Sequence, residues 1–96
     1  MELHAITYDQ IIVIDNEGLE VSFEMPNGEW AVHWDGRINR GEVEYTDSRL
    51  NETITSLDKY QYLIDAFNAE KARIEAERLA AEAEALNATQ AENESA

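Results

Sequence analysis

All four glycines and the single proline of this 96-residue chain lie before Ser56. The residues that follow are mainly Ala, Glu and Leu, which favour helix, whereas Gly and Pro are the strongest helix breakers. Most of the β-branched and aromatic residues, which favour strands, lie before Ser56. The sequence therefore predicts an α+β fold, in which a small antiparallel β-sheet head is packed by one long C-terminal α-helix.

Apolar and polar residues alternate along the head, which is the period of a strand with one buried face. The apolar members are Leu19, Val21, Phe23 and Met25, then Trp30, Val32 and Trp34, then Val43 and Tyr45. We expect strands near 3–8, 10–14, 19–25, 29–34 and 41–46. Turns are expected at 15–18, 26–28 and 35–41, each with a glycine that can take a positive φ.

The helix is expected to begin at Thr55 or Ser56, with Thr55 as N-cap and Asp58 at position N3. The predicted organisation is a head over 1–54, a helix over 55–88 and a disordered acidic tail over 89–96. Within the helix, 55–74 should cover the sheet and 75–88 should project. The expected sheet-facing residues are Tyr60, Leu63, Ile64, Phe67 and Ile74.

A second apolar stripe follows on the helix, about a third of a turn from the first. It repeats at four-three-four-three spacing through Ala72, Ala76, Leu79, Ala83 and Leu86. One interpretation is an Ala-rich extension in solvent, supported by the pairs Lys71–Glu75, Arg73–Glu77 and Arg78–Glu82. The other is a short coiled-coil or docking seam that makes the chain a homo-oligomer. Both interpretations stay open from the sequence.

Two further interface candidates lie in the head. If Ile12 and Ile14 face the core, Ile11 and Val13 must lie on the opposite face. Those side chains are left uncovered unless the chain itself, another subunit or a partner covers them.

The formal charge of −14, from 21 acidic and 7 basic residues, argues against binding to nucleic acid or to an anionic membrane. The chain has no cysteine, which excludes disulfides and thiolate metal sites. No signal peptide or membrane-spanning run is recognisable, so we expect the chain to be made in a cytoplasm.

No catalytic, cofactor-binding or metal site is predicted. His33 should point away from the core, beside Glu42 or Glu44, as a polar cross-strand pair. Nothing in the sequence places His4 near His33, and no nucleophile motif or phosphate-binding loop is present. We therefore expect no enzyme activity and no cofactor.

Residues 30–73 resemble small proteins encoded among the tail genes of tailed bacteriophages. The resemblance rests on Trp30 and Trp34, Gly41 to Tyr45, Asn51 and Glu52, Thr55 to Leu57, and Leu63 to Ala66. It implies a non-enzymatic virion protein of the tail or tail fibre, made in the host cytoplasm, with tail or tail-fibre proteins as partners. The alternatives are an assembly chaperone for such proteins and, from the net charge alone, an acidic inhibitor of a host nucleic-acid enzyme.

Overall fold

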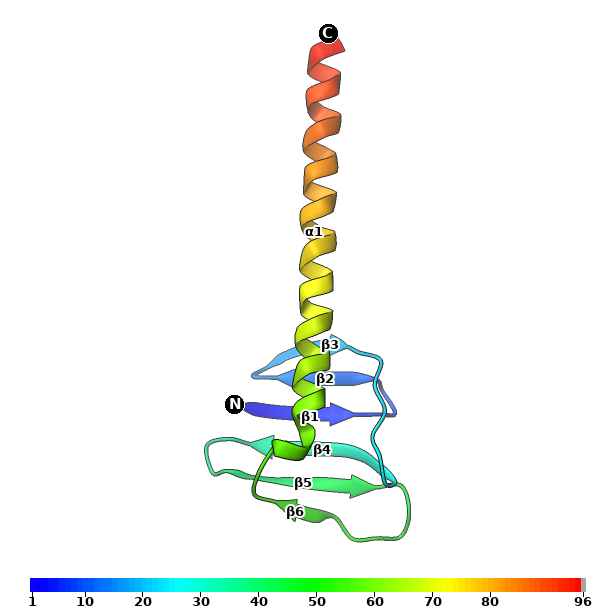
Figure 1. Ribbon diagram of the computed structural model, residues 1–96, viewed down its shortest axis with the longest axis vertical. Coiled ribbons are helices and arrows are strands. Elements are labelled where there is room, and N and C mark those ends of the chain that lie inside the picture. Colours follow the sequence, from blue (N-terminus) through cyan, green and yellow to red (C-terminus); the bar gives the residue numbers. More distant parts are fainter. Residues whose placement is uncertain (96) are drawn as a thin grey trace.

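A computed structural model describes the backbone of residues 1–95 and the side chains of residues 1–88. It confirms the α+β fold: a six-stranded antiparallel sheet followed by one C-terminal helix (Figure 1). The elements are β1 (Glu2–Ile6), β2 (Ile11–Ile14), β3 (Glu17–Glu20), β4 (Glu29–Asp35), β5 (Arg40–Tyr45), β6 (Glu52–Ile54), the 3₁₀ turn η1 (Asp58–Tyr60) and α1 (Gln61–Ser95).

The sheet consists of two antiparallel meanders placed side by side. The strand order is β3-β2-β1-β4-β5-β6, so β1–β3 form one meander and β4–β6 the other. Pairing of β1 with β4 joins them, with Leu3 opposite Trp34 and Ala5 opposite Val32. The first strand of the chain therefore lies in the middle of the sheet.

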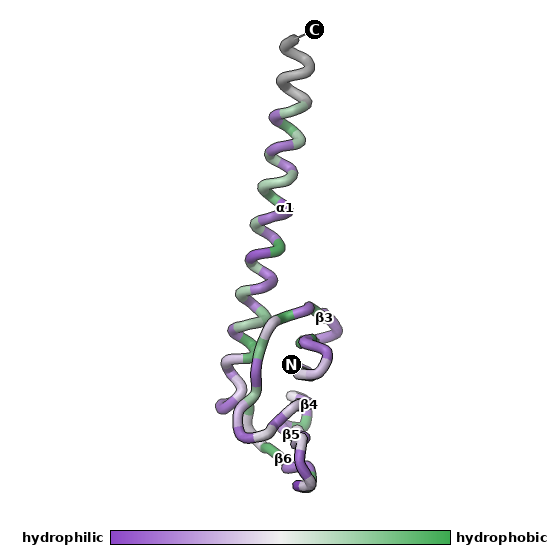
Figure 2. The backbone as a smooth tube through the Cα atoms, turned by 90° about the vertical axis from the view of Figure 1, so that its right-hand side faces the viewer, coloured by the Kyte–Doolittle hydropathy of each residue, from purple (hydrophilic) through white to green (hydrophobic). Residues whose placement is uncertain are grey.

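Residues 21–28 connect the two meanders and differ from the predicted strand over 19–25. The ladder ends at Glu20, after which the chain crosses toward β4 on the same side of the sheet as the helix (Figure 2). Gln10 fixes the crossing, because its amide donates to the Phe23 carbonyl at 2.9 Å and accepts from the Phe23 N–H at 3.0 Å. The predicted alternation survives without a ladder, since Val21 and Phe23 are buried.

Three local predictions need correction. The turn between β2 and β3 takes its positive φ angles at Asp15 and Asn16, the pattern of a type I′ hairpin, and Gly18 lies inside β3. The turn between β4 and β5 likewise takes its positive φ at Asn39 rather than at a glycine. Residues 52–54 form a sixth strand that was not predicted. The helical segment starts at Asp58 rather than at Thr55 or Ser56, so its N-cap is Leu57 and not Thr55, and the Asp58 N–H donates to the Ser56 hydroxyl at 3.1 Å.

The core lies between the sheet, the crossing segment and the first turns of the helix. Its buried members are Leu3, Ala5, Ile12, Val32, Trp34 and Val43 from the sheet, Val21 and Phe23 from the crossing, and Tyr60, Leu63 and Phe67 from the helical segment. Trp30 was expected here, but the register shifts between Glu29 and Ala31. Trp30 instead stacks on Tyr8, with ring centroids 4.8 Å apart.

Beyond the head, α1 leaves the sheet at β3 and projects (Figure 1). Lys71 marks the exit through an ion pair with Glu17 of β3, at 2.7 Å. Every residue of 72–88, here called the arm, is exposed. Ile74, predicted to face the sheet, is 42% exposed and lies outside the core.

The predicted disordered tail, 89–96, lies outside the residues whose side chains are described, so that prediction stays untested. Among the described residues, no helix is long and apolar enough to cross a membrane.

Candidate functional site

The helix covers one face of the sheet and leaves the other uncovered (Figure 2). We call the uncovered side the open face. Strand residues alternate between the two faces, so the neighbours of the buried core residues define it. The open face includes Glu2, His4 and Ile6 on β1, Ile11 and Val13 on β2, Gly18 and Glu20 on β3, the completely buried Ala31 with His33 and Asp35 on β4, and Arg40, Glu42 and Glu44 on β5.

The strand registers arrange these residues in rows across the sheet. One row runs Glu20–Ile11–Ile6–Ala31–Glu44, an apolar centre with a carboxylate at each end. The next runs Gly18–Val13–His4–His33–Glu42, with apolar groups at one end and imidazoles and a carboxylate at the other. The open face is thus apolar over β2 and polar over β4 and β5.

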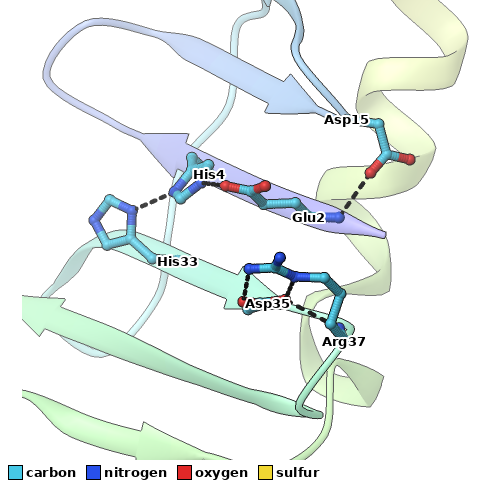
Figure 3. A network of polar contacts seen from close by, with 6 residues as sticks. All are labelled: Glu2, His4, Asp15, His33, Asp35 and Arg37. Carbon is cyan, nitrogen blue, oxygen red and sulfur yellow. Dashed lines mark hydrogen bonds and ion pairs between the residues drawn. The ribbon is translucent and has the colours of Figure 1, made fainter.

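Two histidines meet at the centre of this face (Figure 3). His4 and His33 are directly opposite each other on β1 and β4, and their Nδ1 atoms lie 2.7 Å apart. The Nε2 atom of His4 lies 2.8 Å from a carboxylate oxygen of Glu2, and Nε2 of His33 lies 3.0 Å from one of Glu44. The four side chains form a chain of three hydrogen bonds that spans three strands.

This chain of bonds joins strands that are distant in the sequence. Whether each ring nitrogen donates or accepts depends on the tautomer of its imidazole. The arrangement ties β1 to β4 and, through Glu44, to β5.

A shallow hollow of about 380 Å³ borders the histidine pair and is open to solvent. Its lining includes the carboxylates of Glu2, Asp35 and Glu42 and the guanidinium of Arg40. Hydrogen bonds from Arg37 hold the pKa of the Asp35 carboxyl below its ordinary value. Among the described residues, no group of three or more His, Asp or Glu side chains could hold a metal ion.

The structure corrects one prediction about the histidines and confirms another. His33 lies opposite Glu42 and bonds to Glu44, as expected of a cross-strand pair. His4 was not expected near His33, yet the two rings are in contact. The contact depends on the pairing of β1 with β4, two strands separated in the chain by β2 and β3, and no local pattern in the sequence encodes that pairing.

The sequence-predicted interface residues fall into two separate regions. Ile11 and Val13 lie half-buried on the open face. The arm carries the remaining five, all exposed: Ala72, Ala76, Leu79, Ala83 and Leu86. Nothing in the structure brings the two regions together, because the arm extends away from the sheet (Figure 1).

Ion pairs line the arm, largely as the sequence predicted. Arg73 bonds to Glu77 at 2.6 Å and Arg78 to Glu82 at 2.7 Å. The predicted Lys71–Glu75 pair is replaced by the contact of Lys71 with the head, and Glu75 pairs with Arg78 instead.

Comparison with known proteins identifies no relative. No family model matches this chain, and neither a curated protein nor a solved structure matches it.

Proposed function

We propose that this chain is a non-enzymatic structural protein of a bacteriophage tail or tail fibre, which works through protein–protein contacts. The observation that supports the proposal most is the arm. It extends about 26 Å past the head, at 1.5 Å per residue, and each of its residues is exposed.

The arm exposes large apolar side chains to solvent. Leu79 is 52% and Leu86 is 65% exposed, and both belong to the stripe with four-three spacing. Burying one leucine completely contributes about 1.5–3 kcal/mol, whereas each exposed ion pair along a helix contributes only about 0.3–0.5 kcal/mol. Pairing with a second copy would bury two leucines from each chain and leave the ion pairs in solvent.

The virion context rests on the resemblance of residues 30–73 to tail-region proteins of tailed bacteriophages. Three of the matching residues, Trp34, Val43 and Leu63, are buried in the core, and four others pack partly buried against it: Tyr45, Leu57, Ile64 and Ala66. The resemblance is therefore one of architecture, and the arm is the part that would determine how the chain assembles with other proteins.

The solution mass of the purified chain, measured by light scattering across a concentration series, tests the seam. The mass should exceed the monomer mass of 10.9 kDa. Leu79→Glu with Leu86→Glu should return it to the monomer without unfolding the head. As a matched control, Ala81→Glu with Ala88→Glu adds the same charge on the opposite side of the helix and should leave the oligomer intact.

A wild-type chain that stays monomeric throughout the series would contradict the seam. The virion role has its own test, which is quantitative mass spectrometry of particles purified from the bacteriophage that encodes the chain. A fixed ratio to other tail proteins is expected. A chain absent from particles but bound to a tail protein during infection would be an assembly chaperone, and displacement of DNA from a basic host enzyme would indicate the inhibitor.

A further inference from the structure

The open face of the head is a second interaction surface, distinct from the arm. We propose that it binds a basic amphipathic helix of another protein, with the helix axis along the strands. This inference rests on the proposed role in protein–protein contacts, but it concerns the head alone. Its failure can therefore be told apart from failure of the arm seam.

The apolar part of the open face has the width of one helix. It extends over the neighbouring strands β2 and β1, through the half-buried Ile11, Val13 and Ile6, and it ends at β4, where Ala31 is completely buried. The three strands from β2 to β4 span about 10 Å, and a helix with its side chains is about 10–12 Å across. A single helix therefore covers the apolar row without burying the carboxylates at its two ends.

A glycine keeps this surface open at the β3 side. A Cβ atom built on Gly18 would lie 3.5 Å from a methyl of Val13 and 4.0 Å from one of Ile11. Those are ordinary contact distances, so a larger residue would fit there and cover both apolar side chains. With glycine in place, the side chains of Val13 and Ile11 are accessible to a partner.

The charges on both flanks have the same sign. Glu20 borders the apolar row on β3, and Glu44 borders it on β5 next to Glu42. Glu20 and Glu42 form no ion pair within the described part of the chain. A helix with lysine or arginine on each side of its apolar stripe would pair with both flanks, which favours a basic partner.

A second copy of this chain does not fit the same surface. Its own open face carries the same carboxylates, and like charges placed opposite each other oppose association. The stripe of a second arm is flanked by Glu75 and Glu82, which would face Glu20 and Glu42. The occupant is therefore a different protein with a basic helix.

The probe for the test is a synthetic 18-residue helical peptide with a leucine stripe and lysines on both flanks. Binding to the full chain is followed by amide chemical shifts, and the shifts should concentrate in β1, β2 and β4. Ile11→Thr with Val13→Thr keeps the branched shape of both residues and should weaken binding about tenfold, because apolar contact is lost. Glu20→Gln with Glu42→Gln should weaken it by a similar factor at low salt.

Two controls separate docking from bulk attraction between opposite charges. Glu77→Gln with Glu82→Gln removes the same charge from the arm and should leave the affinity unchanged. A peptide with serine in place of leucine should not bind. The inference is overturned if the arm variant weakens binding as much as the head variant, if the serine peptide binds equally well, or if the shifts map to the arm.

Discussion

Replacing Leu63 by alanine should destabilise the head several times more than the same replacement at Leu79, on the same helix. Leu63 is completely buried in the core, whereas Leu79 is 52% exposed on the arm. Leucine to alanine removes three carbons, worth about 2.4 kcal/mol at 0.8 kcal/mol per buried methylene. The cavity left behind brings the usual cost at a closed site to about 3–5 kcal/mol.

At Leu79 the same change should alter the free energy of unfolding by less than about 0.5 kcal/mol, because the site is exposed and alanine favours helix. The head with its packed helical turns, about 70 residues, should have a stability of about 4–11 kcal/mol. Leu63→Ala therefore removes between a quarter of that stability and all of it. If the variant is unfolded without denaturant, Leu63→Val, which removes one carbon, keeps the comparison measurable at about 1 kcal/mol.

The assay is urea unfolding, followed by tryptophan fluorescence for the head and far-ultraviolet circular dichroism for the helix. It should be run at concentrations where the chain is monomeric, because association through the arm would add apparent stability by mass action. Equal losses at Leu63 and Leu79, or a loss below about 1 kcal/mol at Leu63, would refute the division of the helix into a packed part and a projecting part.

Three further predictions follow from single contacts. Tyr60→Phe removes the hydrogen bond that its hydroxyl donates to Glu29 and should cost about 1–2 kcal/mol in urea unfolding. Burial and the Glu29 carboxylate raise the pKa of Tyr60 above its ordinary value of 10.0. The contribution of Tyr60 to stability should therefore be complete below pH 10 and fall above it. Between pH 10 and 11.5 the phenylalanine variant should lose less stability than the wild-type chain. Hydrogen bonds from arginine lower the pKa of Glu70 and of Glu75. Helix content, measured by circular dichroism, should therefore be constant above pH 4.5, the ordinary pKa of a glutamate, and decrease as the pH falls below it. A constant signal down to pH 2 would contradict the ion pairs. Gly41→Ala would place a Cβ atom 2.2 Å from a backbone carbonyl oxygen of β4, and a loss of about 1–3 kcal/mol is expected; an unchanged urea midpoint would show that the two strands separate easily.

The sequence predicted the parts of the fold that depend on local patterns. Alternation placed Val32, Trp34 and Val43 on one face because a strand's side chains alternate whatever its neighbours are. The absence of Gly and Pro after Ser56 predicted a single long helix. The prediction of which side of the helix faces the sheet was correct at Leu63, where the helix crosses the sheet.

The remaining features depend on contacts distant in sequence. The bulge that removes Trp30 from the core shifts the register of two strands and leaves no mark in the alternation. The short strand 52–54 is too brief for alternation to mark it, although Thr53 and Ile54 are β-branched, and it pairs along the edge that β5 offers. Ile74 has the correct helical phase for the core, but the sheet ends before it. The His4–His33 pair likewise required the order of the strands, which the sequence does not reveal.

The central position of β1 has a consequence for synthesis of the chain. The ribosome makes β1 first, but one edge of that strand has no partner until β4 has been made. Even then the sheet exposes its apolar side until Leu63 and Phe67 emerge and cover it. Translation must therefore enter the helix before the head can close. A product terminated earlier would keep an apolar face and an unpaired strand edge, both of which favour aggregation and recognition by cellular quality control.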